Sequence, residues 1–250
     1  GDPYGPRGKF RMPPPVRAMM READAVGLVG RGLFADLARQ AGAREVLYIP
    51  FSFDRVRFGR PAATARERPD AVSMIGSLWK SRIPFLLIPG ARQRQETADR
   101  LAARYGARFA LYGNGWTRNA SARGPLPFTR QQEAIQQSWV NVSWNHFTHV
   151  ADYFSDRLPI ALAAGVAHVM SWQPGFDAFF ADCPGLFLAR TPKDACDQVD
   201  ALLARSPDEL IDLGRQAREW AYAHLEATVV FRPVIDRCIQ LRNASNRAAP

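Results

Sequence analysis

The sequence predicts an α/β protein built on a doubly wound parallel sheet, preceded by a smaller unit of the same kind. The first observation is residues 140–172, where an apolar run, a polar loop, a helix-like block and a second apolar run follow one another. That order is typical of a βαβ unit in an open parallel sheet. The second is that strand-like and helix-like segments alternate from Ala71 to Arg205. The third is an isolated βαβ pattern near the N-terminus, too small to bury a core alone.

The smaller unit is expected within residues 1–58. Its elements are, in order, an irregular Pro- and Gly-rich lead-in, a short helix, a strand, a helix and a strand, over residues 1–15, 15–23, 26–29, 33–41 and 45–49. The pattern then breaks, and residues 59–70, which carry Pro61 and many charges, predict a linker.

The main domain is expected over residues 71–225. Its strands are predicted at residues 71–76, 109–112, 140–144, 166–172 and 185–189. Its helices are predicted at residues 77–106 (with proline breaks), 129–137, 157–164, 174–180 and 191–205. A further helix should begin at Ser206, because a capping hydroxyl, a proline and two acids follow one another there. Residues 226–250 are expected to form a C-terminal helix and tail.

Composition describes an ordinary soluble globular protein of 250 residues, with 47% hydrophobic and 23% charged residues. No apolar run approaches about 18 residues, so no transmembrane segment is expected, although peripheral membrane contact stays open. The three cysteines have no CxxC spacing and cannot all pair, and the N-terminus has no signal-peptide core, so we expect a cytoplasmic protein. Because the chain does not begin with Met, we expect a processed form or a fragment.

The formal charge of +9 comes almost entirely from arginine. The densest basic cluster, residues 92–104, also carries Glu96 and Asp99, whereas a nucleic-acid binder should gather its charge in one stripe. We therefore expect no nucleic-acid partner. A preference for phosphorylated small molecules fits the charge equally well.

Motifs for several enzyme classes are missing from the sequence. HExxH, DxD, GxSxG and GxxxxGK[ST] do not occur, and His146 and His149 lie in a loop without a nearby cysteine. These absences argue against a metal site, a serine hydrolase and a P-loop enzyme. We expect no cofactor.

The loop before the helix at residues 157–164 suits a phosphate. Ser155, Asp156 and Arg157 place a capping group, backbone N–H groups and a guanidinium at one helix start. Loops at the carboxyl ends of parallel strands are where such sheets bind ligands. The plainer alternative is a capped helix with a solvated arginine.

Four motifs in order resemble the C-terminal portion of a GT-B glycosyltransferase of group 1, especially its CgeB-like (spore-maturation) branch. They are the linker Tyr48–Phe58 (with Ser52 or Phe53 where glycine is usual), the strand end Met74–Ser77, the turn Tyr112–Trp116 (YGNGW), and the helix Arg157–Gly165 (RLPIALAAG). The resemblance covers about residues 24–240. It implies that residues 1–58 end an acceptor-binding Rossmann-like domain and that the C-terminal helix crosses back to it.

The resemblance also implies metal-independent transfer of a sugar, as a hexosyltransferase would perform it, from a nucleoside-diphosphate sugar to an unknown glycan, protein or small-molecule acceptor. The expected donor diphosphate-binding residues are Gly76, Ser77, Lys80, Arg82, Ser155, Asp156 and Arg157. The expected base- and ribose-binding residues are Tyr112, Trp116, Asn145, Asp152 and Tyr153, and for the two aromatic residues Tyr112 and Trp116 a place in the core is the alternative. No catalytic residue is assigned, because the family's base usually belongs to the N-terminal domain.

One position departs from the family pattern. The glutamate that usually binds the donor ribose falls on Ile160, and Asp152 and Asp156 are the nearby acids that would have to replace it. Two other functions therefore stay open: a non-catalytic nucleotide-sugar-binding or interaction module, and a nonhydrolysing sugar-nucleotide epimerase.

Overall fold

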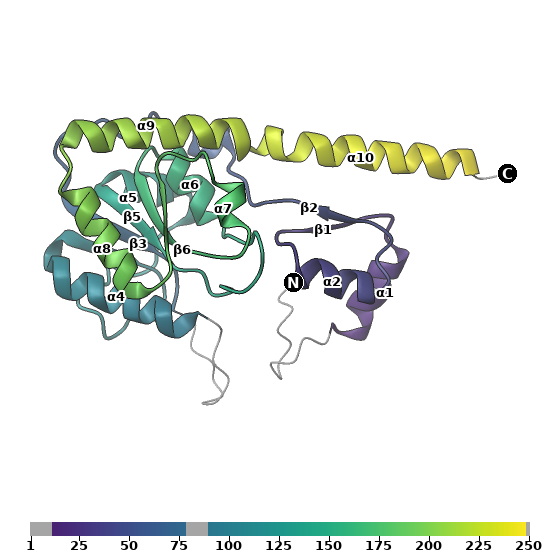
Figure 1. Ribbon diagram of the computed structural model, residues 1–250, viewed down its shortest axis with the longest axis horizontal. Helices are drawn as coiled ribbons and strands as arrows, with labels where there is room; N and C mark the ends of the chain where they lie inside the picture. Colours follow the sequence, from purple (N-terminus) through teal and green to yellow (C-terminus); the bar gives the residue numbers. More distant parts are fainter. Residues whose placement is uncertain (1–11, 79–89, 249–250) are drawn as a thin grey trace.

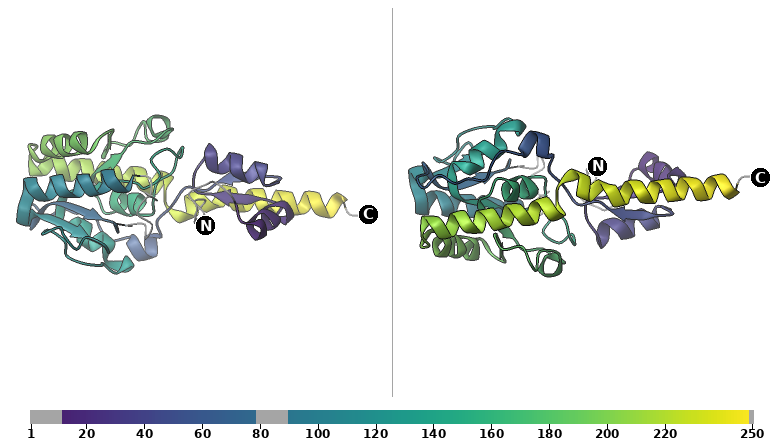
Figure 2. Two further views of the ribbon diagram at one scale, coloured as in Figure 1. Left: turned by 90° about the horizontal axis from the view of Figure 1, so that it is seen from below. Right: turned by 90° about the horizontal axis from the view of Figure 1, so that it is seen from above.

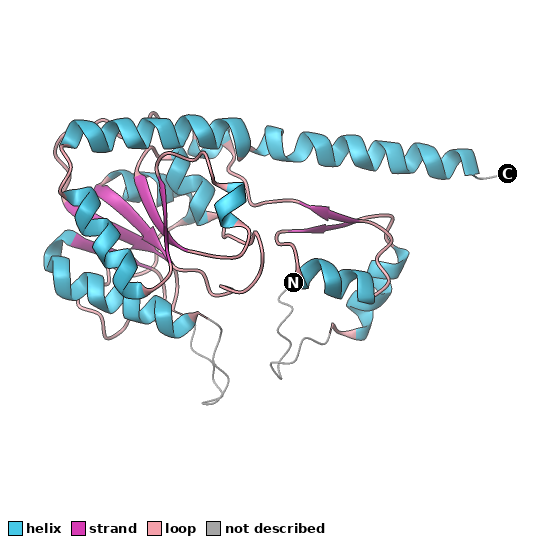
Figure 3. Ribbon diagram, in the orientation of Figure 1, coloured by secondary structure: helices cyan, strands magenta, loops and turns pink. Residues whose placement is uncertain are grey.

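The computed structural model describes residues 12–78 and 90–248, which form two parallel sheets flanked by helices. One sheet has five strands and the other has two. Figure 1 shows the larger sheet enclosed by helices and the separate smaller sheet beneath the long C-terminal helix α10. Figure 3 shows the same arrangement by type of element. The predicted α/β class with a parallel sheet is confirmed.

The five-stranded sheet has the order β4-β3-β5-β6-β7 and every neighbouring pair is parallel. The strands are β3 (Asp70–Ile75), β4 (Phe109–Tyr112), β5 (Ser138–Ser143), β6 (Ala167–Ser171) and β7 (Leu186–Ala189). The chain thus passes from β3 to one neighbour, β4, and then returns to the other side of β3 as β5. This reversal of strand order is the topological switch point of a doubly wound fold.

The central strands of this sheet are the most deeply buried, whereas the edge strand β7 is mostly half-buried. All six residues of β3 and all five of β6 are buried, because helices cover both faces. The polar side chains among them bond to one another: the Ser73 and Ser138 hydroxyls lie 2.6 Å apart, and the Asn141 amide donates to Ser73 Oγ. Burying these polar side chains without hydrogen-bond partners would be unfavourable.

Helices form a layer on each face. They are α4 (Ala91–Tyr105), α5 (Gln131–Gln136), α6 (Arg157–Ala163), α7 (Phe176–Phe179), α8 (Pro192–Leu203) and α9 (Pro207–His224). Helices α4 and α8 pack in one hydrophobic cluster, whereas α5, α6, α7 and most of α9 pack in the other. The cap predicted at Ser206 is present as a capping box with Glu209, and Thr191 caps α8 by accepting from the Asp194 N–H. The helix expected from residue 77 is described only from Ala91 onward.

The smaller unit comprises α1 (Pro14–Glu22), β1 (Val26–Leu28), α2 (Leu33–Gln40) and β2 (Val46–Tyr48), with β1 and β2 parallel. The predicted βαβ pattern is therefore present. A short helix, α3 (Arg55–Phe58), and irregular chain over residues 59–69 lead to β3.

Helix α10 (Ala227–Ala248) returns the chain to the smaller unit. Phe53 N–H donates to Leu225 O, and Ala227 N–H donates to Phe53 O, so the outgoing and returning segments pair beside the start of α10. Further along, the guanidinium of Arg237 donates two hydrogen bonds to the carboxylate of Glu45. The two views of Figure 2 show α10 running alongside the small unit. No helix within residues 12–78 and 90–248 is both long and apolar enough to cross a membrane.

Candidate functional site

The carboxyl edge of the five-stranded sheet, between β3 and β5, is where this fold places a ligand. Strands β3 and β5 are neighbours, and their connections leave toward opposite sides of the sheet. The crevice beyond such a switch point is the usual binding position in open α/β sheets. The segments that follow the two strands begin at Gly76 and Trp144.

The segment after β3 is held by the glycine turn after β4. The Trp116 indole N–H donates to Gly76 O at 2.6 Å, and Leu78 N–H donates to Asn114 O at 2.8 Å. Gly113 has φ +130°, and a Cβ there would lie 2.5 Å from Gly76 O. Glycine is therefore needed at Gly113 for this close approach.

Arg94 joins the two strand ends. Its Nε donates to Trp144 O at 2.6 Å and its Nη1 donates to Ser77 O at 2.8 Å. The residue is only 6% exposed, and burial together with the nearby charge of Arg157 lowers its pKa to about 9. Sequence reasoning missed Arg94. The available signal was its place on the buried stripe of α4 that also holds Thr97, Ala98 and Leu101.

Arg157, the first residue of α6, also lies beside Gly76. A Cβ built on Gly76 would lie 3.3 Å from Arg94 Nη1 and 3.9 Å from Arg157 Nε. The absence of a side chain at Gly76 thus leaves room beside two guanidiniums. Arg157 Nε is buried and has no hydrogen-bond partner among the described residues.

His146, on the loop after β5, completes the cluster and was also missed as a ligand-binding residue. Burial lowers the pKa of His146 the most, and the positive charges of Arg94 and then Arg157 lower it further, to about 3. The ring is therefore neutral. Its Nε2 is buried without a partner within the described parts of the chain. We call Arg94, His146 and Arg157 the switch-point cluster.

The remaining residues predicted at the diphosphate lie nearby or cannot be placed. Ser155 and Asp156 immediately precede α6, but the Asp156 carboxylate makes no capping hydrogen bond and lies 3.8 Å from the Arg157 guanidinium instead. The sequence offered the Ser155 hydroxyl or the Asp156 carboxylate as the capping group, and the carboxylate does not cap because Asp156 already has helical φ and ψ. Lys80 and Arg82 lie outside the described residues.

Two of the predicted base- and ribose-binding residues, Trp116 and Asn145, are buried and bond to other residues of the protein. Trp116 is 4% exposed and its indole bonds to Gly76, so the core alternative is the one that the structure adopts. Asn145 is buried, and its side-chain amide donates a hydrogen bond to Gln173 Oε1. Tyr112 remains half-buried at the end of β4, within 3.3 Å of an Arg123 nitrogen.

Asp152 and Tyr153 face the smaller unit. Asp152 has φ +55°, is buried, and its carboxylate lies 3.3 Å from Arg31 Nη1. The Tyr48 hydroxyl donates to Asp152 O at 2.7 Å, and the Tyr153 ring packs edge-on against Phe34. The loop that carries His146 therefore also contacts the smaller unit.

Two further predictions concern acids and metals. Ile160, at the position of the family's glutamate, is 1% exposed and packs in the hydrophobic core. No carboxylate can act from that position. Among the described residues no group of three or more His, Cys, Asp or Glu side chains could hold a metal ion.

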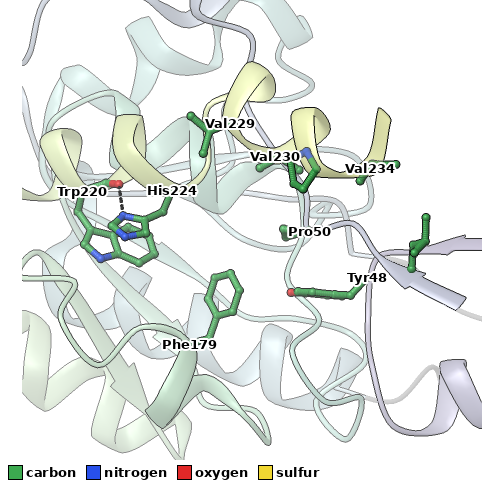
Figure 4. A pocket seen from close by; sticks show the side chains of 10 residues that line it. Tyr48, Pro50, Phe179, Trp220, His224, Val229, Val230 and Val234 are labelled. Carbon is green, nitrogen blue, oxygen red and sulfur yellow. Dashed lines mark hydrogen bonds between the residues drawn. The ribbon is translucent and has the colours of Figure 1, made fainter. Parts of the chain in front are cut away.

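An apolar pocket of about 380 Å³ lies elsewhere, between the smaller unit and the junction of α9 with α10. Figure 4 shows Tyr48, Phe179 and His224 around it, with His224 Nδ1 bonded to Trp220 O at 2.9 Å. Its walls carry no Arg, Lys, Asp or Glu side chain. It therefore lacks the charges that a diphosphate requires, which the switch-point cluster has.

Comparison with known proteins identifies a family and a fold. A family model described as "Glycosyl transferase-like" matches residues 92–229, more than half of the chain. No curated protein matches the sequence.

Among solved structures, sucrose-phosphate synthase from Thermosynechococcus elongatus has 16% identity and a TM-score of 0.64, covering 91% of this chain and 61% of that one. A variant of S. aureus TarM, in complex with Fondaparinux, alpha-GlcNAc-glycerol and UDP, has 13% identity and a TM-score of 0.65, covering 94% and 48%. Anabaena HepE, in complex with UDP and glucose, has 11% identity and a TM-score of 0.63, covering 88% and 64%. The chain thus spans about half to two thirds of the length of these proteins.

Proposed function

Because the chain belongs to the glycosyl transferase-like family, we propose that it binds a nucleoside-diphosphate sugar at the switch-point cluster and transfers the sugar to an acceptor. The fold that it shares with S. aureus TarM and Anabaena HepE, both solved with UDP, supports this proposal. The activity is proposed for the whole protein, since the chain spans 48% of the first and 64% of the second. The CgeB-like branch stays a prediction.

One observation carries the proposal: two guanidiniums meet beside Gly76 at the switch point, and one of them is almost fully buried. Arg94 is fixed by two backbone carbonyls, and Arg157 Nε has no described partner. Fixed cations in a site with little water interact strongly with anions. They also stabilise the charge that grows on a leaving diphosphate when the sugar departs.

We propose further that this transfer needs no metal ion, because the guanidiniums supply positive charge at the diphosphate. Binding of UDP, measured by calorimetry, should then survive EDTA. Loss of binding in EDTA that magnesium or manganese restores would contradict this part of the proposal. A sample that is treated with EDTA and then supplied again with metal ion provides the control for damage to the protein by the chelator.

The site itself is tested with Arg157→Ala. Removing one charge-assisted contact costs about 1.5–3 kcal/mol, a roughly 10- to 150-fold weaker dissociation constant for UDP or another nucleoside diphosphate. Arg118→Ala, in the exposed loop after Trp116, is the matched control and should bind normally. Arg123 is unsuitable as a control because it pairs with the buried carboxylate of Asp70. Unchanged affinity in Arg157→Ala would place the site elsewhere.

A non-catalytic binding module is the second candidate. It is favoured by the buried Ile160 and by the engagement of Asp152 with Arg31, which leave Asp156 as the remaining nearby acid that was expected to replace the family's glutamate. Release of free sugar from UDP-glucose by the protein would support the enzyme. Tight UDP-glucose binding without hydrolysis or transfer to any of a panel of glycans, proteins and small molecules would support the module.

A further inference from the structure

Residues 144–157, which include His146 and Arg157 of the switch-point cluster, contain several buried donors without hydrogen-bond partners among the described residues. Six buried side-chain atoms lack a hydrogen-bond partner within residues 12–78 and 90–248, and three of them are Trp144 Nε1, His146 Nε2 and Arg157 Nε. Native proteins leave few such groups unpaired, because an unpaired buried polar atom costs stability. Three nitrogens concentrated in 14 consecutive residues therefore require an explanation.

The chemistry of these atoms indicates what they lack. The indole and guanidinium nitrogens can only donate hydrogen bonds, and the imidazole Nε2 donates in one of its two neutral forms. The ionised groups that act on His146 are Arg94 from α4 and Arg157 from α6, and both are positive. The missing partner is therefore an acceptor with negative charge.

We propose that His146 is an uncharged hydrogen-bond donor to the diphosphate of the nucleotide sugar, with Nε2–H directed at a phosphate oxygen whose charge Arg94 and Arg157 balance. This inference rests on the proposed function. It adds a residue from the loop after β5 to the site and gives it a role different from that of the arginines. A third cation would be repelled by the two guanidiniums in the empty site, whereas a neutral ring adds direction without added repulsion.

The loop that carries His146 is held in place by hydrogen bonds from Gln173 and by packing against the start of α4. Gln173 donates to Phe147 O at 3.0 Å and to Val150 O at 2.9 Å, so the chain after His146 is tied to the end of β6. On the other side, a Cβ on Gly90 would lie 2.9 Å from His146 O, and the start of α4 therefore packs directly against this residue. Rigid support is what a binding group needs if its hydrogen bond is to be made without further ordering.

The test uses His146→Leu, which removes the donor, and His146→Gln, which retains an N–H. His149→Leu, on the exposed part of the same loop, is the matched control. With UDP-glucose as the probe in calorimetry, the leucine variant should bind about tenfold more weakly, the glutamine variant within about threefold of the parent, and the control normally. Parent-like affinity in His146→Leu, when the parent binds, overturns this inference alone. No binding by the parent overturns the proposed function and this inference together.

Two readouts separate a ligand donor from a structural histidine. Thermal melts should show His146→Leu at or above the parent, because the substitution removes an unpaired buried polar group. A lower melting temperature with unchanged binding would show that the role is structural. The parent's affinity for UDP-glucose should also stay level between pH 5.5 and 8. A tenfold loss per pH unit above a midpoint would instead mean that the ring binds as an imidazolium.

Discussion

The two parallel sheets of this protein use the same βα alternation but differ in how they are stabilised. Every residue of β3 and β6 in the five-stranded sheet is buried, whereas no residue of β1 or β2 in the two-stranded sheet is. A strand that is buried on both faces contributes to a core that its own unit supplies. The two-stranded sheet has no such core, so its stability has to come from contacts with the rest of the chain.

Those contacts combine ring packing with ion pairs. Phe34 packs edge-on against Phe147 and Tyr153, and Tyr48 packs against Phe179. Arg31 reaches Asp152, and Arg237 bonds Glu45. Exposed ion pairs of this kind stabilise proteins weakly. We therefore expect the small unit to open locally at a lower free energy than the five-stranded sheet.

The largest expected difference between the sheets appears on truncating a leucine in each unit. Leu162, in α6, is 0% exposed, and Leu162→Ala should lower the free energy of unfolding by about 2–5 kcal/mol through lost burial and a cavity. Leu28→Ala, in β1, should cost less than about 1.5 kcal/mol, because Leu28 is only half-buried. Urea denaturation of both variants measures the two values. Equal losses would mean that the small unit has as strong a core as the large one.

Much of this fold could be predicted from the sequence because parallel strands, when covered on both faces, appear as short apolar runs. Residues 109–112 and 166–172 are such runs, and the segment that begins at Ser206 carries its helix signal locally. The expected helix from residue 77 was less reliable, since two prolines interrupt that stretch and the described helix begins only at Ala91.

The site was harder to predict because its members come together only in three dimensions. Arg94 bonds to carbonyls 17 and 50 residues away, at Ser77 and Trp144, and no local pattern contains that information. An aromatic residue after a strand can pack or bind a base, and only the burial of Trp116 decides between them. Gly76, Ser77 and Arg157 are predicted site residues that the structure does bring together at one strand end. Their role in donor binding stays a prediction.

The second prediction is that mild acid weakens the five-stranded sheet through His168. Burial lowers the pKa of this β6 residue to about 3, against about 6.5 when unfolded. Between those values the unfolded chain binds the extra proton, so stability rises with pH in this window and falls on acidification. From pH 7.5 to pH 5, this single group should cost about 2 kcal/mol. His146, whose pKa is lowered in the same way, adds a loss of the same sign.

Urea denaturation at several pH values tests this effect, with His168→Gln expected to flatten the slope even if it lowers stability overall. The small unit has no histidine within residues 12–58 and should lack the effect. The salt-bridged carboxyl of Glu45 has a pKa lowered by Arg237, so its contribution is lost only below about pH 4.5. An unchanged slope in His168→Gln would show that this ring does not cause the acid sensitivity.

The smallest expected effect is that of Arg31→Ala on the joint between the units. The variant loses the 3.3 Å pair with Asp152 and the stacking on Tyr48, but Arg31 is more than half exposed, so solvent screening limits the loss to about 1 kcal/mol or less. In hydrogen exchange this corresponds to up to about fivefold faster opening. The change should be confined to amides of residues 26–48. Arg39→Ala, which removes an exposed pair with Asp36 inside α2, is the control and should change nothing at the joint. If Arg31→Ala speeds exchange equally in β3 and β6, the two sheets open together as one cooperative unit, and the contrast between a self-sufficient sheet and a dependent one is wrong.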